Sequence, residues 1–427
     1  MSSRYPVAVR VSLLARYSAL PSLAGPDFIP IALVARLPLA MLTIGTLALV
    51  SVASGSYALG GLAAGAVGIG SAVGAPALGW LADRYGQRRT VLVAGLLNTA
   101  TTAGVIAVSY APGGLHESAP LPLIAVSLAA GLTLPQVGPL ARARWMALTE
   151  RRPLRELERD AAFSYESTAD ELTFVLGPAL VGALGAAIAP WLPLALAAVL
   201  TAVFVTAFAV HPTAAAVHTA ARTGRPAPDG ADAAPAAAGS WTPVVLPAAG
   251  MLAMGAFFGS TQAALTAFAG ELGAAETAGL LYAALGLTSA VAALSVAAWP
   301  AKFTLAARWT ACAGALTALA FLMLVPHSLG AMAAMMLLVG VPVGPIMVTV
   351  YGLGGRLAPA GRMGTAMTAL ASGLVAGVAL GAGTAGVLAE GGGSPAALAA
   401  PLVCAAALAL LGATSLLLPR GHARPAA

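Results

Sequence analysis

Long apolar runs constrain this chain more than any other feature of its sequence. A bilayer-spanning helix needs about 20 mostly apolar residues, and twelve runs of that kind follow one another, separated by charges or Pro/Gly clusters. Only 8% of the residues are charged and 59% are apolar, whereas a soluble domain carries about 25% charged residues. We therefore expect an all-α integral membrane protein with twelve transmembrane helices. The expected spans are 29–53, 57–80, 90–111, 121–143, 163–187, 190–210, 243–269, 277–299, 308–326, 330–352, 363–388 and 396–418.

A segment without apolar periodicity divides the twelve spans into two groups of six. Residues 212–242 are rich in Ala, Pro, Gly, Asp and Thr, a composition typical of a flexible linker. The tripeptide Val137-Gly138-Pro139 recurs as Val343-Gly344-Pro345, and this echo favours two pseudo-symmetric six-helix bundles. The expected organisation is an N-terminal tail at 1–28, bundles at 29–211 and 243–418, a cytoplasmic linker at 212–242 and a C-terminal tail at 419–427.

The distribution of basic residues orients the chain. If both termini are cytoplasmic, all but one of the 21 Lys and Arg residues are assigned to cytoplasmic segments, including Arg142 and Arg144 at the cytoplasmic end of the fourth span. This asymmetry is the positive-inside pattern. Together with a residue usage typical of GC-rich bacterial genomes, it predicts a multi-pass protein of the bacterial inner membrane with cytoplasmic termini. The net charge of +6 is then a topology signal, and we expect no nucleic-acid partner.

The loop after the second span carries the most specific motif of the chain. It reads Gly79-Trp80-Leu81-Ala82-Asp83-Arg84-Tyr85-Gly86-Gln87-Arg88-Arg89, and it resembles the signature loop of the major facilitator superfamily in pattern and position. The resemblance implies a transporter whose two bundles are latched together in one conformation by this loop. An acidic side chain here can also meet the positive N-terminal end of a neighbouring helix. The candidate latch residues are Gly79, Asp83, Arg84, Gly86, Arg88 and Arg89.

The fifth span contains a second, partial resemblance. Gly177-Pro178-Ala179-Leu180-Val181-Gly182 is similar to the core of a motif typical of the family's antiporters, with Gly177, Pro178 and Gly182 as its main residues, although the upstream glycines are missing. A Gly-Pro pair bends a helix and frees a carbonyl that a bundle interior can tolerate, so a simple packing kink is the alternative. The family's exporters often carry an Arg within the fourth helix, and no Arg precedes Arg142 here.

Four charged residues stand out within the first and fifth expected spans: Arg36, Glu166, Asp170 and Glu171. Each costs roughly 2.5–3.5 kcal/mol on insertion scales. Arg36 and Asp170 both lie roughly 10 Å from the start of their spans, at about 1.5 Å per residue, so they can form an ion pair. Glu166 and Asp170 share a helix face, and like charges there favour a carboxyl that keeps its proton. The alternatives are a static Arg–carboxylate pair or snorkelling to the interface.

Two amides at the expected membrane depth complete the candidate site. Gln136 and Gln262 lie in the fourth and seventh spans, and the resemblance places both helices beside the central pathway; a helix–helix hydrogen bond is the alternative. The sequence contains no phosphate-binding loop, nucleophile elbow or Cys/His cluster. We therefore expect neither a catalytic residue, nor a metal site, nor a cofactor.

These observations favour a transporter over an enzyme. We expect proton-coupled export of a small amphipathic or apolar compound by alternating access, with the substrate, protons and the lipid bilayer as partners of a monomer. Few buried polar residues argue against the first alternative, uptake of a polar solute, because sugars and organic acids need many hydrogen-bond partners. The second alternative, a membrane-embedded transferase, needs a polar cluster at one membrane face, which the fifth span alone offers.

Overall fold

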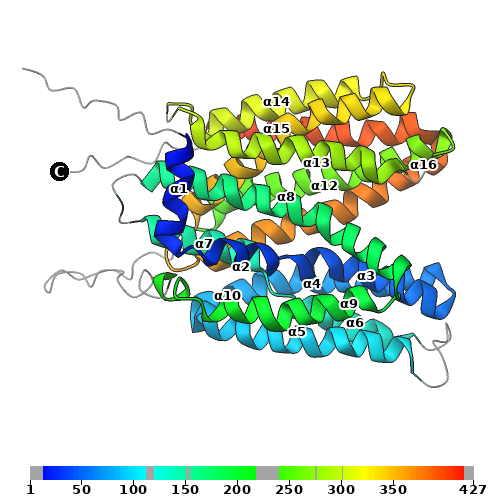
Figure 1. The fold of residues 1–427 in the computed structure, drawn as a ribbon. Coiled ribbons are helices and arrows are strands. Elements are labelled where there is room, and N and C mark those ends of the chain that lie inside the picture. The colour runs from blue at the N-terminus through cyan, green and yellow to red at the C-terminus, as the bar shows by residue number, and fades with distance from the viewer. Residues whose placement is uncertain are drawn as a thin grey trace, which may run out of the picture.

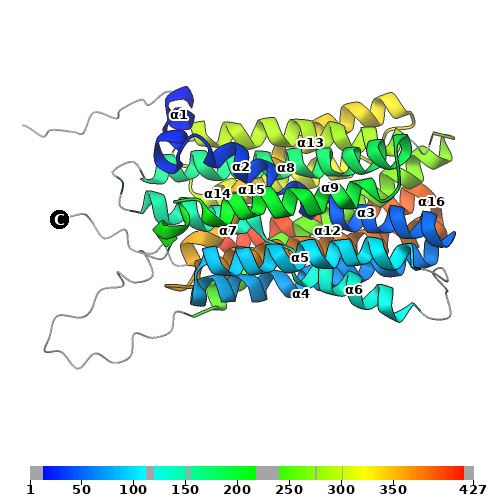
Figure 2. The same cartoon turned by 60° about the horizontal axis from the view of Figure 1, so that its bottom comes forward.

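The computed structural model describes residues 13–111, 120–150, 152, 155–217, 240–274, 277–300 and 302–417. Within these ranges every regular element is a helix, and most helices run along one common direction (Figures 1 and 2). Eleven helical segments are long and apolar enough to cross a membrane. The last of them, α16 (Met363–Ser415), holds two crossing segments joined at a kink, so the predicted twelve-helix architecture is confirmed.

The N-terminal half supplies six crossings, two of which consist of two helices with an interruption between them. The first is interrupted at Ala35 and Arg36, just before Pro38, and the fourth at Thr133 to Gln136, around Pro135. Proline breaks a helix because it has no N–H and restricts the residue before it. The elements are α2 (Phe28–Val34) with α3 (Leu37–Ser54), α4 (Tyr57–Tyr85), α5 (Gln87–Ser109), α6 (Leu121–Leu132) with α7 (Val137–Thr149), α8 (Arg155–Ala187), and α9 (Leu192–Leu200) with η1 (Thr201–Val205) and α10 (Thr206–Val210).

The C-terminal half supplies the other six crossings. Its elements are α12 (Thr242–Glu271), α13 (Ala278–Ser295) with η3 (Val296–Ala298), α14 (Leu305–Leu322), α15 (Leu329–Leu357) and the two segments of α16. Gly392 and Gly393 separate these segments, and Gly393 has a φ of 67°, which favours glycine. Glu271 accepts hydrogen bonds from the Ser394 N–H and hydroxyl, both at 2.6 Å. An acidic side chain at the end of α12 thus caps the start of the last crossing.

We expect Glu271→Ala to lower the thermal unfolding midpoint of the detergent-purified protein, because the Ser394 donors lose their acceptor. Glu390→Ala is the matched control, since Glu390 is an exposed carboxylate near the same kink. Equal midpoints for the two variants would show that the cap contributes nothing to stability.

Each half has its own apolar core. One large cluster, which includes Met251, Trp309 and Met336, fills the C-terminal half, and a separate cluster around Leu42 and Val67 lies in the N-terminal half. The halves meet where α4 packs on α16 and where α8 packs on α13; Figure 1 shows the blue-to-green N-terminal half beside the yellow-to-red end of the chain. A smaller cluster, with Phe163 of α8 and Val296 of η3, joins the two halves, so any site lined by both halves lies at the seam between their cores.

The predicted tail at 1–28 differs from the structure, because residues Leu13–Ala24 form a helix, α1, that lies across one end of the bundle (Figures 1 and 2). Leu20 is buried in a cluster with Phe28 and Trp145 of the N-terminal half. On the other side, the Tyr17 hydroxyl donates to the Leu294 carbonyl at 2.6 Å, and Arg16 donates to the Ala297 carbonyl. This helix therefore contacts both halves.

The predicted linker at 212–242 also starts too early. Thr213 is buried and accepts a hydrogen bond from Arg144, so the first residues of this range belong to the packed N-terminal half. Residues 218–239 lie outside the described part of the chain, as do 1–12 and the predicted tail at 419–427.

Candidate functional site

At the end of the bundle where α16 begins, Asp83 of α4 caps the first turn of that helix. Its Oδ1 accepts from the Gly364 N–H at 2.8 Å, and its Oδ2 accepts from the Thr365 N–H at 2.7 Å and hydroxyl at 2.6 Å. Gly79 permits the approach, because a Cβ there would lie 2.7 Å from the Gly364 carbonyl oxygen. One carboxylate thus joins the two halves at the positive end of a helix.

The other members of the predicted latch lie at the turn between α4 and α5. Arg84 lies over the rings of Trp80 and Tyr85, 5.3 and 5.5 Å from their centroids, and Arg88 and Arg89 are exposed at the start of α5. Gly86 has a φ of 94°, which an L side chain rarely adopts. Gly86 therefore permits the backbone conformation of the turn, and the three arginines give the turn a positive charge. Gly79 and Asp83, in contrast, contact α16.

Two ion pairs join the halves at the same end. Arg308 of α14 lies 3.0 Å from Asp160 of α8, measured from Nη1 to Oδ2, and Arg356 of α15 pairs with Glu156 of α8. From the sequence, both arginines were interpreted only as part of the positive-inside pattern. In the structure, both side chains reach across the interface between the halves. Together with the Asp83 cap, these contacts close this end of the bundle in the conformation described.

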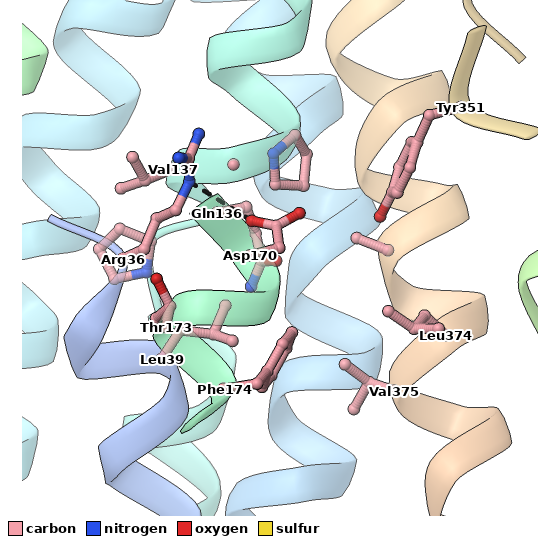
Figure 3. Close-up of a pocket in the computed structure, with 14 residues that line it drawn as sticks. Arg36, Leu39, Gln136, Val137, Asp170, Thr173, Phe174, Tyr351, Leu374 and Val375 are labelled. Carbon is pink, nitrogen blue, oxygen red and sulfur yellow. Dashed lines mark ion pairs between the residues drawn. The ribbon is translucent and has the colours of Figure 1, made fainter. Parts of the chain in front are cut away.

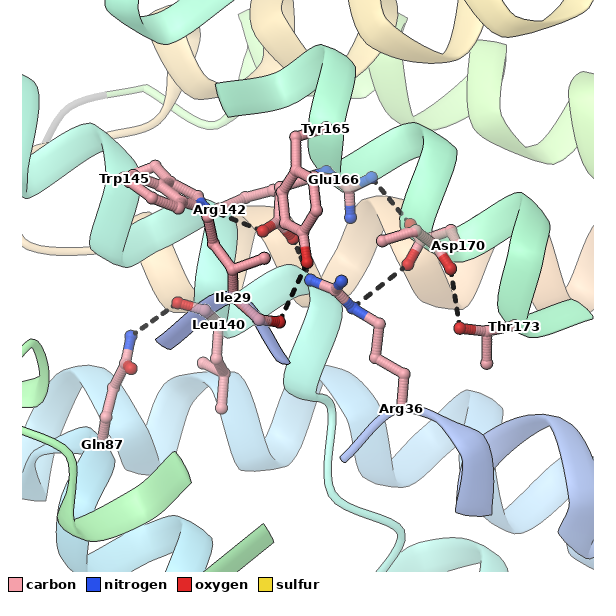
Figure 4. A network of polar contacts seen from close by, with 11 residues as sticks. Ile29, Arg36, Gln87, Leu140, Arg142, Trp145, Tyr165, Glu166, Asp170 and Thr173 are labelled. Carbon is pink, nitrogen blue, oxygen red and sulfur yellow. Dashed lines mark hydrogen bonds and ion pairs between the residues drawn. The ribbon is translucent and has the colours of Figure 1, made fainter. Parts of the chain in front are cut away.

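A network of buried charges lies deeper in the N-terminal half (Figure 4). Arg36 donates to Glu166, and its Nε lies 3.4 Å from Asp170 Oδ1. Arg142 Nη2 lies 2.7 Å from Asp170 Oδ2, and Trp145 Nε1 donates to Glu166 Oε1 at 2.8 Å. Arg36 is 4% exposed and Arg142 and Glu166 are fully buried, so their charges must be stabilised by one another.

The two broken helices make room for this network. Arg36 stands at the break between α2 and α3, and Gln136 at the break between α6 and α7. A Cβ at Gly138 would lie 3.0 Å from Asp170 Oδ1 and 3.3 Å from Arg36 Nε, so a side chain here would crowd the ion pair. Discontinuous helices with polar groups at membrane depth are typical of transporter binding sites.

A small cavity of about 50 Å³ lies beside the network, between the two halves (Figure 3). Most of its walls are apolar, and Arg36, Gln136 and Asp170 provide its strongest polar groups. The N-terminal half contributes Arg36, Leu39, Pro135, Gln136, Val137, Gly138, Pro139, Asp170, Thr173 and Phe174, and the C-terminal half contributes Tyr351, Ala371, Leu374 and Val375. Arg142 also reaches across the interface, with its guanidinium carbon 3.9 Å from the centroid of the Tyr351 ring, a cation–π contact.

The position predicted for Arg142 was wrong. The prediction ended the fourth span at residue 143 and placed Arg142 in the cytoplasm, but α7 continues to Thr149 and buries this side chain completely. A charge marks a membrane boundary only where it lacks a partner in the bundle, and Asp170 provides one. The signal that could have extended the helix is the absence of a breaker before Arg152-Pro153.

Arg144 was misplaced for the same reason. It is fully buried in α7 and donates to Gln87 Oε1 and the Phe208 carbonyl, both at 2.8 Å, and to the Thr213 hydroxyl at 3.0 Å. Neutral acceptors thus hold this guanidinium, and it ties α7 to α5 and α10.

The remaining predicted charges are arranged differently from the expected pair. Arg36 and Asp170 do lie together, but the main partner of Arg36 is Glu166. Glu171 points toward the other half, where the Ser289 hydroxyl of α13 donates to its Oε1 at 2.7 Å. Glu166, Asp170 and Glu171 of α8 therefore have two different environments.

The two predicted amides lie in different places, and the residues of the fifth-span motif have different surroundings. Gln136 is buried, lines the cavity and donates to the Leu134 carbonyl at 3.1 Å, whereas Gln262 is exposed on α12 and lies outside this lining. A Cβ at Gly177 would lie 2.6 Å from Ala40 Cβ, so this glycine lets α8 approach α3. Pro178 lies inside the continuous helix α8, and Gly182 faces open space.

Comparisons with known proteins agree on one family. The family model described as the Major Facilitator Superfamily matches residues 31–371. The human organic anion transporter MFSD10 (TETRAN) has a similar structure, with a TM-score of 0.65 and 17% identity over 90% of this chain and 98% of that one. A bacterial homologue of the iron transporter ferroportin, in an outward-facing state, has a TM-score of 0.68 and 16% identity, over 92% and 98%.

The fucose:proton symporter of E. coli has a similar fold, with a TM-score of 0.60 and 14% identity over 90% of this chain and 98% of that one. At these identities the likeness shows the fold alone. No curated protein matches the sequence.

Proposed function

Because this chain belongs to the major facilitator superfamily of membrane transporters, we propose that it exports a small amphipathic or apolar compound in exchange for protons, by alternating access. One observation carries the proposal: a cavity lined by both halves lies beside ion-paired charges at membrane depth. A central site of this kind is exposed to each side in turn when the halves move against each other. The protein works as a monomer in the bacterial inner membrane, without a catalytic residue or a cofactor.

The contacts between the halves fit one state of that cycle. With both termini in the cytoplasm, the end closed by Asp83, Asp160 and Glu156 is the cytoplasmic end. The latch then holds the transporter closed toward the cytoplasm, and these contacts must break before a substrate enters from that side. The partial antiporter motif at Gly177 and Pro178 favours export over uptake.

The lining supports an amphipathic substrate. Leu39, Phe174, Leu374 and Val375 offer apolar surface for the body of a ligand, and burial of such surface favours binding. A second candidate, a compound with an acidic group, is favoured by Arg36, whose buried Nη1 has no hydrogen-bond partner among the described residues. An acceptor from the ligand would satisfy this donor.

The test is transport by purified protein in proteoliposomes with an imposed proton gradient. We expect ethidium, an amphipathic cation, or carboxyfluorescein, an amphipathic acid, to accumulate in the acidic lumen of vesicles whose transporters expose their cytoplasmic face outward. Nigericin, which collapses the gradient, should abolish accumulation. Accumulation that persists with nigericin would exclude proton coupling, and failure of both probes would exclude this substrate class.

A further inference from the structure

We infer that Glu171 is the site that binds the coupling proton and that Glu166 and Asp170 are not. This assignment rests on the proposed proton-coupled transport. Glu171 lies near the middle of α8, and its partner Ser289 lies near the middle of α13. The carboxyl group is thus far from both ends of its crossing and lies on the line where the two halves meet.

Glu166, Asp170 and Glu171 of α8 differ in what neutralises them. Glu166 is paired with Arg36, and Asp170 with Arg142 and Arg36. Among the described residues Glu171 has no ion-pair partner, and its contact is the neutral hydroxyl of Ser289. An ionised carboxylate without a cation is costly at membrane depth, whereas the two paired carboxylates are stabilised as anions. In this conformation Glu171 therefore holds a proton.

The groups around Glu171 do not offset its charge. Asp170 on the same helix and Tyr282 on α13 act on it electrostatically, and neither is a cation. Arg36 and Arg142, which pack against the middle of α8, are directed to Glu166 and Asp170, and Arg308 and Arg356 are paired with Asp160 and Glu156 near its start. A Cβ at Gly286 would lie 3.9 Å from Glu171 Oε2, so that oxygen lies beside the α13 backbone. Binding a proton is the remaining way to neutralise this carboxyl group.

Its position between the halves links this proton to the transport cycle. The hydrogen bond from Ser289 joins α8 of one half to α13 of the other, so relative movement of the halves changes the surroundings of Glu171. The Glu171 carboxylate takes one proton from water on the outer side and becomes neutral. The neutral group can then form the hydrogen bond with Ser289 that is present when the cytoplasmic end is closed. It returns that proton to water on the cytoplasmic side when the cytoplasmic end opens.

The first test needs no substrate. Dicyclohexylcarbodiimide is an apolar reagent that modifies protonated carboxyl groups within membranes, and peptide mass spectrometry of the full-length protein locates the adduct. We expect the label on Glu171, decreasing as the pH rises, with Glu166 and Asp170 unmodified. An adduct mainly on Glu166 or Asp170, or an unmodified Glu171 at every pH, would overturn the assignment.

The second test separates coupling from transport. Glu171→Gln keeps an acceptor for Ser289 and mimics the protonated state, so the variant should fold and exchange ethidium across vesicles that contain it on both sides. It should lose uphill, gradient-driven accumulation. Full uphill accumulation by this variant would refute the assignment. If the wild-type protein moves neither ethidium nor carboxyfluorescein, the proposed function fails, whereas the labelling result still decides which carboxyl group binds the proton.

Discussion

Replacement of Arg36 by alanine is expected to cost roughly 3–5 kcal/mol of stability, because it leaves Glu166 charged and buried without its main partner. The yield of monodisperse protein after detergent extraction, and its thermal unfolding midpoint, should both fall sharply. The double variant Arg36→Ala/Glu166→Gln should recover much of this loss, since the introduced amide needs no cation and its carbonyl oxygen can still accept from Trp145.

The matched comparison is Arg36→Ala/Asp170→Asn. This pair of changes leaves Glu166 unpaired and also removes the carboxylate that holds Arg142, so it should be less stable than the Arg36 single variant. A better recovery with the Asp170 change than with the Glu166 change would show that Arg36 and Asp170 form the principal pair.

The second large effect is expected for Asp83→Asn. The substitution replaces a carboxylate that accepts three hydrogen bonds from the first turn of α16 with a neutral amide. A hydrogen bond to a charged group contributes about 1.5–3 kcal/mol, so the equilibrium should shift toward the cytoplasm-open state by about tenfold or more, while membrane insertion stays intact. Transport should slow, because the closed state is less populated.

A single cysteine measures this shift. Ala371 on α16 lines the cavity, and Ala371→Cys in a chain without Cys312 and Cys404 should react faster with an impermeant thiol reagent from the cytoplasmic side when Asp83→Asn is present. Arg88→Gln is the control, since Arg88 belongs to the same motif and is exposed on α5. Unchanged labelling in the Asp83 variant would reduce the loop to a topology signal.

The sequence predicted the crossings well because hydropathy and length are properties of a whole segment. A run such as 330–352 needs no knowledge of its neighbours to be recognised as a crossing, and α15 spans Leu329–Leu357. Asp83 could be predicted because it belongs to a motif that occurs at a fixed position, the loop after the second crossing. Both predictions depend only on consecutive residues and not on contacts between helices.

The contacts between helices could not be predicted in the same way. The choice of Glu166 as the main partner of Arg36 depends on how the start of α3 packs against α8, and the burial of Arg142 depends on Asp170 of another helix. Gln262 is exposed for a similar reason, since hydropathy does not show which face of α12 is turned inward. A position within a segment fixes depth approximately, but it does not fix the direction of a side chain.

The helix α1 makes the closing of the bundle end at which Asp83 lies depend on a segment outside the twelve crossings. Arg16 and Tyr17 hold carbonyls at the end of α13 and η3, while Leu20 is packed in the N-terminal half. Separation of the halves at this end must therefore strip α1 from one of its two supports, and the work of undocking adds to the activation barrier of the opening step. A binding partner or modification that detached α1 would lower this barrier. It would change the rate of the transport cycle without altering the cavity in which the substrate binds.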